Sequence, residues 1–356
     1  MLFDRLKKLI AHKYYPLNRI EISRKKIINN YQYLCSINKN IKIAPVLKSN
    51  AYGHGIVEIA KILDDQNPPF FCVDSIFEAY KLYKIKVKTP ILIMGYVNPK
   101  NLIIKNLPFS YAVYDLQQLT DVLKYQPNAG IHIFVDTGMH REGIEVHDLE
   151  KFIKKIPTNY LNNIEGIMSH FGEAENPKKK ETIEQINNFK KAVDILKNNY
   201  IFPKWRHIAN SSGLLNSKAL KLEEISNMAR CGFSLYNSAL RFITHISQIK
   251  ELKKGSKIGY SFTYTAKKNM KTAVLPVGYN DGVDRGFSNK GLAIIRGKNC
   301  PILGRVSMNI TVVDVSEVRD VQVGDEVEID FKTPLDGKIL YEILVHLNSQ
   351  IKRVVV

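Results

Sequence analysis

The sequence predicts an α/β protein: a (β/α)8 TIM-type barrel followed by a C-terminal all-β domain. Two patterns in the 356 residues carry this prediction. From about residue 41, short apolar runs of strand length alternate with segments of helical periodicity, which is typical of parallel α/β folds. After about residue 245 the chain changes to short β-rich segments separated by turn residues. A chain of this length suffices for two domains.

Eight candidate strands alternate with helices, and eight strands are the number that closes a TIM-type barrel. The strands are IKIAPVL (41–47), FFCVD (70–74), PILIMG (90–95), YAVYD (111–115), IHIFVD (131–136), IEGIMSH (164–170), WRHIAN (205–210) and MARCGFSLY (228–236). Helical patterns lie between them at 76–85, 116–125, 149–156 and 183–198. We therefore predict the barrel over residues 16–245.

The remaining chain predicts a β domain over residues 246–356. Its expected strands lie in segments 258–266, 271–279, 292–297, 300–315 and 325–330. Gly255, Gly297 and Gly324 stand where strand connections are expected. The early strand NRIEI (18–22) is expected to pair with this domain. Residues 1–15 form an N-terminal extension with one apolar helical face, which favours a short helix docked on the body over an interfacial anchor.

The composition excludes several classes of protein. No apolar run approaches the roughly 20 residues of a membrane span. The net charge of +18 is scattered rather than gathered with aromatic residues, which argues against nucleic-acid binding. The four cysteines are isolated, which predicts reduced thiols and no zinc site. HFGEAE (170–175) permits a metal site, but no H-x-H or H-E-x-x-H pair supports it. We expect a soluble, cytoplasmic protein with no metal and no nucleic-acid or membrane partner.

Polar residues at the carboxyl ends of the predicted barrel strands mark the candidate site, because barrel enzymes carry their chemistry there. In chain order these are Lys48, Asp136 with Arg141, His170, His207 with Asn210 and Ser211, and Arg230. Lys48 is unusual, since an ammonium group seldom follows an apolar strand. Its amine could form a Schiff base with a carbonyl compound. The plainer alternatives are a solvated lysine and histidines that are only structural.

The last two predicted strands are followed by loops suited to a phosphate. NSSG (210–213) follows the seventh strand and CGFSLYN (231–237) follows the eighth. These loops are where barrels of this type commonly bind phosphate through backbone N–H groups. A phosphorylated cofactor that carries an aldehyde would suit both the lysine and the loops, and pyridoxal phosphate (PLP) is such a compound.

Taken together, these segments resemble the bacterial alanine racemases, a family of fold-type III PLP enzymes. The matching blocks, in the family's order, are VLKSNAYGHG (46–55), VDTGMHREG (135–143), GIMSHF (166–171), HIANSSG (207–213), ARCGFSLYN (229–237), GYSFTYTA (259–266), PVGYNDG (276–282) and GRVSMN (304–309). The resemblance runs from about residue 17 to the C-terminus.

The resemblance implies a role for each matching residue. Lys48 and Tyr260 would be catalytic, with Tyr260 of the partner subunit completing each site of a homodimer. The cofactor-binding residues would be Lys48, Tyr52, His170, Asn210, Ser211, Arg230, Gly232 and Phe233, with Arg230 facing the pyridine nitrogen. Arg141 and Met308 would bind the substrate. The implied activity is interconversion of L-alanine and D-alanine by a two-base mechanism, supplying D-alanine for peptidoglycan.

Four positions depart from the family pattern, the mildest being Glu175, which replaces an aspartate of the entry corridor. Phe134 stands where many relatives carry a carbamylated lysine that orients the arginine matching Arg141. Asn309 replaces an aspartate, and Ser349 replaces a phosphate-side tyrosine. These changes leave open a broader-specificity or serine-preferring amino-acid racemase. A decarboxylase of this fold would place a carboxylate at the pyridine nitrogen, so Arg230 argues against that class. A PLP carrier protein would consist of the barrel alone.

Overall fold

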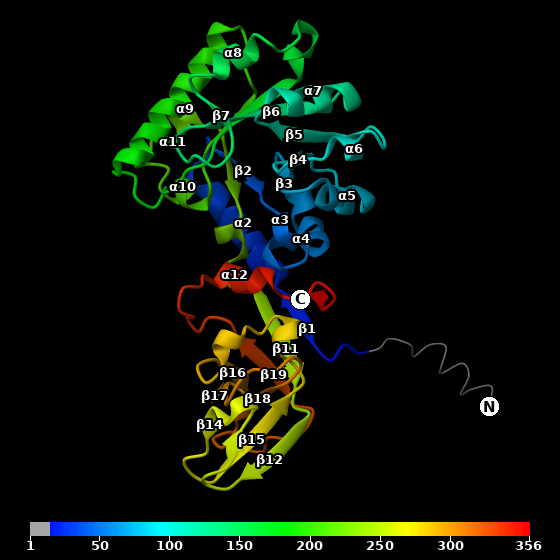
Figure 1. Cartoon of the computed structure of the whole chain (residues 1–356), viewed down its shortest axis with the longest axis vertical. Coiled ribbons are helices and arrows are strands. Elements are labelled where there is room, and N and C mark those ends of the chain that lie inside the picture. Colours follow the sequence, from blue (N-terminus) through cyan, green and yellow to red (C-terminus); the bar gives the residue numbers. More distant parts are fainter. Residues whose placement is uncertain (1–14) are drawn as a thin grey trace, which may run out of the picture. The chain divides into compact units, whose positions relative to one another are not determined.

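The computed structural model describes residues 15–356 (Figure 1). The chain forms two compact units: residues 23–239, and the segment before Ser23 together with Leu240–Val356. The division therefore falls at 239/240, whereas the patterns in the sequence place the domain boundary at 245/246. Of the N-terminal extension predicted at 1–15, all but Tyr15 lies outside the described residues.

Eight parallel strands close the barrel of the first unit. They are β2 (Lys42–Pro45), β3 (Phe71–Val73), β4 (Ile91–Ile93), β5 (Phe109–Val113), β6 (Gly130–Asp136), β8 (Ile164–Met168), β9 (Trp205–His207) and β10 (Met228–Cys231). Parallel ladders run in the order β3-β4-β5-β6-β8-β9, and β10 pairs with β2. A Val46–Cys72 bridge joins β2 to β3, and Arg230 N–H donates to Ala209 O between β10 and β9. All eight predicted strands are present, and the predicted barrel is confirmed.

Helices follow the strands around the barrel (Figure 1). They are α2 (Arg24–Ile37), α4 (Ile56–Leu63), α5 (Ile76–Lys84), α6 (Pro99–Leu102), α7 (Leu116–Tyr125), α8 (Leu149–Ile153), α9 (Lys180–Asn198), α10 (Ser211–Leu215) and α11 (Leu222–Ile225). Side chains in the strand–helix turns fix where helices begin. Ser75 accepts from Glu78 N–H at α5, and Asp115 accepts from Gln118 N–H at α7. These capped starts set the length of the loops at the carboxyl ends of the strands.

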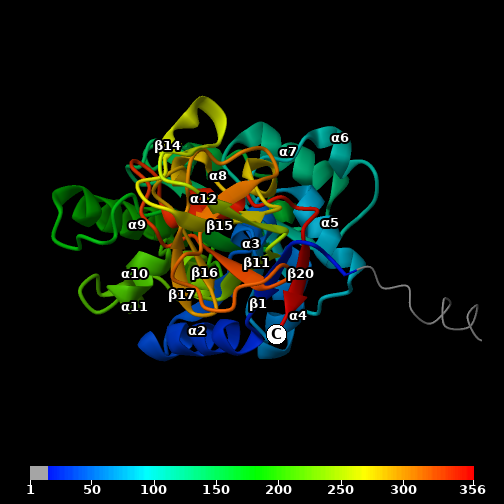
Figure 2. The ribbon, with the colours of Figure 1, turned by 90° about the horizontal axis from the view of Figure 1, so that it is seen from below.

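The second unit is built mainly from antiparallel strands. Its largest sheet has the order β17-β16-β19-β11-β1-β20, and smaller sheets join β12-β15-β18 and β13-β14. The strands are β1 (Arg19–Ile22), β11 (Leu240–His245), β12 (Gln248–Leu252), β13 (Lys257–Ile258), β14 (Tyr264–Thr265), β15 (Met270–Leu275), β16 (Leu292–Ile295), β17 (Lys298–Pro301), β18 (Thr311–Asp314), β19 (Glu326–Asp330) and β20 (Lys352–Val355). β1 pairs antiparallel with β11 and parallel with β20 (Figure 2). The β-rich character predicted for this part of the chain is confirmed, and one unpredicted helix, α12 (Leu340–Val345), lies within it.

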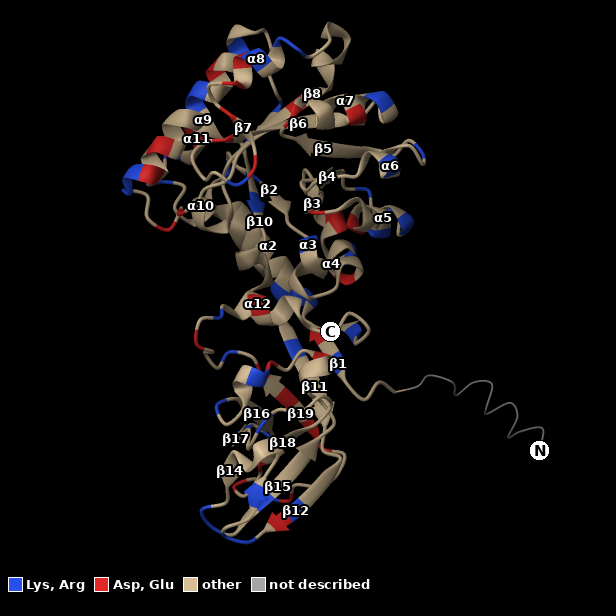
Figure 3. Ribbon diagram, viewed as in Figure 1, with Lys and Arg blue, Asp and Glu red and all other residues tan. Residues whose placement is uncertain are grey.

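Basic and acidic residues are interspersed along the helices of the barrel (Figure 3). On α9, for example, Lys197 pairs with Asp194 at 3.2 Å, and Lys190 pairs with Glu224 of α11 at 3.3 Å. Between residues 15 and 356, no helix combines the length and the apolar character needed to cross a lipid bilayer.

Candidate active site

Lys48 begins α3 (Lys48–Tyr52), a turn of unusual handedness directly after β2. The four residues from Ser49 to Tyr52 have φ between 52° and 54°. Left-handed helical backbone costs roughly 1–2 kcal/mol for each non-glycine residue. Neighbouring groups hold the turn: Asn50 Oδ1 accepts from Ile56 N–H at 3.0 Å. Strained backbone of this kind is typical of functional sites.

The Lys48 amine points to a partly open position. Its Nζ lies 3.8 Å from Asp74 Oδ1, and the lysine side chain is 41% exposed. Glu78 of α5 stabilises both loops, because its carboxylate accepts from Asn50 N–H at 3.4 Å and from Asp74 N–H at 3.0 Å. The amine is thus accessible to a carbonyl compound while its backbone is held from two sides.

Arg230, at the end of β10, is a buried cation with four hydrogen bonds. Nη1 donates to His207 Nδ1 at 2.7 Å and to His207 O at 2.9 Å. Nη2 donates to Ser169 O at 2.6 Å and to His170 Nδ1 at 3.1 Å. Burial lowers the pKa of Arg230 to about 10, which still leaves the guanidinium charged at neutral pH. Four of its five N–H groups are committed, and only Nε–H remains for another acceptor.

His170 is held as a neutral imidazole. Burial, and then the charges of Arg230, Arg141 and Lys48, lower the pKa of His170 to about 3. Because its Nδ1 accepts from Arg230, its proton must sit on Nε2. The ring is therefore a hydrogen-bond donor at the site and carries no charge at neutral pH.

This neutral state predicts a pH dependence of stability. The folded-state pKa of His170, about 3, lies below its ordinary value of 6.5, so between these values the unfolded chain binds more protons. The unfolding free energy should therefore fall as pH falls through this window. Replacing His170 by glutamine should reduce the loss between pH 7 and pH 5 by about 1–2 kcal/mol. Urea unfolding at pH 7 and at pH 5 measures this difference in unfolding free energy for each protein.

His147, whose side chain is 75% exposed, provides the matched control for that experiment. His147→Gln should leave the pH dependence of the unfolding free energy close to that of the natural protein. If His170→Gln behaves in the same way as the control, His170 is not held neutral by burial.

The predicted phosphate-side residues come together after β9 and β10. Asn210 caps α10 by accepting from Gly213 N–H at 2.9 Å, and Ser211 Oγ accepts from Ser234 N–H at 3.3 Å. The loop after β10 therefore adjoins the start of α10. Gly232 packs against the Tyr52 hydroxyl so closely that an added Cβ would overlap it. Phe233 is 58% exposed beside this group.

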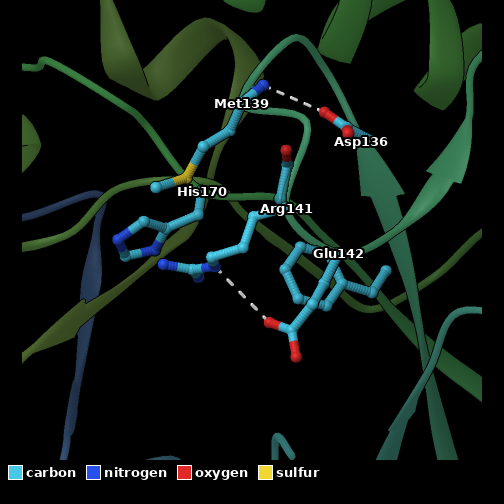
Figure 4. Close-up of a pocket in the computed structure, with 7 residues that line it drawn as sticks. Asp136, Met139, Arg141, Glu142 and His170 are labelled. Atoms are coloured by element: carbon cyan, nitrogen blue, oxygen red, sulfur yellow. Dashed lines mark hydrogen bonds and ion pairs between the residues drawn. The ribbon is translucent and has the colours of Figure 1, made fainter.

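Arg141 lies on the loop between β6 and β7 (Ile144–Glu145), in a small pocket with His170 (Figure 4). Asp136 Oδ1 shapes this loop by accepting from the N–H groups of residues 138, 139 and 140 at 2.8, 3.0 and 3.2 Å. Arg141 Nε lies 3.6 Å from Glu142 Oε2. Phe134, which the resemblance places where many relatives have a lysine, is buried against Ala112 and Met168 and forms a wall of the pocket. A carboxylate that the sequence patterns did not single out, that of Glu142, thus accompanies Arg141.

Tyr260 and Met308 belong to the second unit, and their side chains are 70% and 57% exposed. Their loops adjoin each other. A Cβ added to Gly259 would lie 3.3 Å from Arg305 N, and Asn280 N–H donates to Met308 O at 3.0 Å. The second unit therefore presents both predicted residues on exposed, neighbouring loops.

Two polar residues inside the barrel also escaped the sequence analysis. His132 in β6 is fully buried, and Glu165 in β8 accepts a hydrogen bond from it. A signal was present, because each is a titratable residue inside an apolar strand segment. Both residues lie within strands, so the search for polar residues at strand ends does not find them.

Comparison with known proteins identifies two family models along the chain. The model "Alanine racemase, N-terminal domain" matches residues 22–239, and "Alanine racemase, C-terminal domain" matches residues 239–355. Alanine racemase 1 of Caldanaerobacter subterraneus subsp. tengcongensis is 34% identical over 333 residues, which cover 87% of this chain and 84% of that protein.

Solved structures agree with the sequence comparison. An alanine racemase from Clostridium difficile superposes with a TM-score of 0.83 at 27% identity and covers 97% of both chains. An alanine racemase from Bartonella henselae with covalently bound pyridoxal phosphate superposes with a TM-score of 0.82 at 24% identity, covering 96% of this chain and all of that one.

Proposed function

The chain belongs to the alanine racemase family, and from this premise we propose that it interconverts L-alanine and D-alanine with PLP held by Lys48. The observation that carries the proposal is the assembly of four features at the carboxyl ends of the barrel strands. These are an accessible amine, a buried guanidinium, a neutral imidazole and the Tyr52–Gly232 contact beside the start of α10. The alanine racemase function agrees with the family models across both units.

The residues present fit PLP. Because Gly232 has no Cβ, the Tyr52 hydroxyl can lie directly against the backbone at 232–233, and we assign the phosphate to that hydroxyl, Ser211 and this backbone. Asn210 holds the start of α10 in place. The Bartonella relative binds the same cofactor covalently. When bound, PLP stabilises negative charge that develops at the substrate Cα.

Arg230 and His170 determine the charge and the hydrogen-bond donors around the cofactor ring in the proposed site. The remaining Nε–H of Arg230 is the group we assign to the pyridine nitrogen. A guanidinium donates a hydrogen bond but does not readily give up its proton, so the ring nitrogen would stay unprotonated. His170, neutral and protonated at Nε2, would lie beside the ring without adding charge.

Racemisation also needs a proton acceptor and donor on each face of the substrate Cα. We assign the Lys48 amine to one face and the phenol of Tyr260 of the partner subunit to the other. Arg141 and Met308 would bind the substrate carboxylate. This assignment requires a homodimer with shared sites, and we propose a cytoplasmic enzyme that supplies D-alanine for peptidoglycan.

A test of the cofactor assignment uses Gly232→Ala. The protein should racemise L-alanine once loaded with PLP. The added methyl group should weaken PLP binding about tenfold or more, because overpacking a tight contact costs about 1–3 kcal/mol. Titration of PLP followed by absorbance measures the affinity.

Gly172→Ala is the control, since its Cβ would meet only Gln185 Oε1, at 3.7 Å. Equal PLP affinity in the two variants would remove the phosphate from the Tyr52–Gly232 contact. No racemisation of alanine by the loaded protein would end the proposal.

The proposal also concerns the range of substrates, which we infer from Ser349. Ser349 is exposed in a turn whose neighbour Asn348 donates to Asn280 O at 3.1 Å, so it adjoins the loop that contacts Met308. A serine in place of the family's tyrosine leaves space and a hydroxyl. We propose that alanine remains the preferred substrate and that serine is also racemised.

Ser349→Tyr should sharpen the preference for alanine. The change in the alanine-to-serine ratio of kcat/KM should be modest, on the order of tenfold, because a methylene-sized difference in a pocket is worth about 1–3 kcal/mol. Chiral chromatography with both substrates measures the ratio. If the two proteins show the same ratio, Ser349 does not set specificity.

A further inference from the structure

A chain of hydrogen bonds runs from Arg230 through the interior of the barrel to Glu165. Arg230 Nη1 meets His207 Nδ1 at 2.7 Å, and His207 Nε2 meets His132 Nδ1 at 2.7 Å. His132 Nε2 meets Glu165 Oε1 at 3.2 Å. Both imidazoles are fully buried and Arg230 is 4% exposed, while 32% of the Glu165 side chain is exposed. The four residues come from β10, β9, β6 and β8, so the chain crosses half of the barrel.

The proton positions in this chain are fixed by its cationic end. A guanidinium only donates, so His207 Nδ1 must accept and the His207 proton must sit on Nε2. That proton is donated to His132 Nδ1, which places the His132 proton on Nε2, facing the Glu165 carboxylate. An imidazolium at His132 would require His207 Nε2 to accept, and His207 would then oppose Arg230 with a second N–H. Every hydrogen bond therefore points from Arg230 toward Glu165.

The pKa values agree with this assignment. Burial lowers the pKa of both His132 and His207, so both rings are neutral at neutral pH. Burial alone would raise the pKa of Glu165, but hydrogen bonds from His132 and Ser110 lower it overall, so the carboxylate is ionised. The chain has a positive end, two neutral rings and a negative end.

Two glycines leave the room that the chain occupies. A Cβ on Gly166 in β8 would overlap the ring of His132, and a Cβ on Gly130 in β6 would overlap Glu165 Oε1. Neither glycine has a positive φ, so backbone conformation does not require glycine at these positions. The close approach of the polar side chains does.

We propose that Glu165 is a positioning residue for Arg230, acting through His132 and His207. The other acceptors of Arg230, at Ser169 and His170, are neutral, so the carboxylate at the far end of the chain is the negative charge connected to the guanidinium. Polarisation along the buried hydrogen bonds extends the electrostatic effect of this carboxylate to Arg230. It fixes Nη1 toward His207 and so directs Nε–H to the position we assign to the pyridine nitrogen. Only this last step rests on the proposed function.

The first experiment examines the full chain without any cofactor. Two-bond proton–nitrogen correlation spectra of the 15N-labelled imidazoles report which ring nitrogen carries the proton. His132 and His207, assigned with His132→Gln and His207→Gln, should both appear as neutral rings protonated at Nε2. Either ring appearing as an imidazolium, or protonated at Nδ1, overturns the proposal. This measurement tests the proposal even if proteins with a substitution at Glu165 do not fold.

The second experiment compares Glu165→Gln with Glu150→Gln in PLP-loaded protein. Glutamine at 165 keeps an acceptor for His132 but removes the charge, whereas Glu150 is an exposed residue of α8 that pairs with Lys154. Glu165→Gln should shift the His207 Nε2 signal and the absorbance maximum of the bound cofactor. It should lower kcat about tenfold with little change in KM, in line with the effects of outer partners of liganding histidines.

Glu150→Gln should resemble the natural protein, and Glu165→Asp should recover part of the loss. Unchanged imidazole and cofactor spectra in Glu165→Gln overturn the proposal. A protein that shows the predicted imidazole protonation yet neither binds PLP nor racemises alanine would refute the proposed function and leave the chain of hydrogen bonds intact.

Discussion

Replacing Lys48 by alanine should lower racemisation in both directions by roughly 10³-fold or more, because the proposed mechanism makes this one residue both the cofactor anchor and a proton acceptor. Its amine is accessible, with 41% of the side chain exposed, and its backbone is fixed by a left-handed turn that Glu78 helps to hold. Circular dichroism of alanine solutions measures each direction. Borohydride reduction followed by peptide mapping should place the cofactor label on Lys48 in the natural protein.

Lys61→Ala provides the control for that substitution, because Lys61 is an exposed lysine on α4 of the same unit. It should retain activity and the label. A label found on another lysine, or near-natural activity in Lys48→Ala, would remove Lys48 from the mechanism.

Mixing two inactive proteins should restore activity if sites are shared between subunits. Lys48 belongs to the barrel unit and Tyr260 to the unit of β strands, so each site of the proposed homodimer would take one residue from each chain. A heterodimer of Lys48→Ala with Tyr260→Phe would then contain one intact site. With random exchange at equal amounts, about a quarter of the natural activity should return.

The control for the mixing experiment is a double variant, Lys48→Ala with Tyr260→Phe, mixed with Lys48→Ala. No arrangement of these chains contains an intact site, and activity should stay absent. If subunit exchange is demonstrated by differently tagged chains and the two single variants still recover nothing, the two residues do not act across subunits.

The strands of the barrel were predictable because each is an apolar run of strand length bounded by polar or glycine residues. The run 131–136, for instance, is observed as β6 over Gly130–Asp136. The left-handed turn at Ser49–Tyr52 was not predictable, since none of its four residues is a glycine and part of its support, the Glu78 carboxylate that accepts from Asn50 N–H, is distant in sequence. Strand β11 (Leu240–His245) was not predicted either, because its partners β1 and β19 are distant in sequence.

The candidate site divides in the same way. Lys48, Arg230 and His170 were found from their positions at strand ends, where the fold itself gathers side chains. The position of the Glu142 carboxylate next to Arg141 depends on how one loop is folded. The chain of hydrogen bonds through His132 and His207 depends on which way side chains point inside the barrel. Neither arrangement follows from spacing along the chain.

The pairing of β1 with β11 bears on how the protein forms during its synthesis. β1 leaves the ribosome roughly 200 residues ahead of β11, and later still comes its other neighbour β20. At about 5–20 residues per second, this nascent strand waits on the order of 10–40 seconds with both edges unsatisfied. Arg19 and Glu21 alternate with the apolar residues of β1, and charges on such an edge discourage pairing with other chains. One edge of β1 is therefore equipped to remain unpaired until β11 is made, and the other until β20 is made.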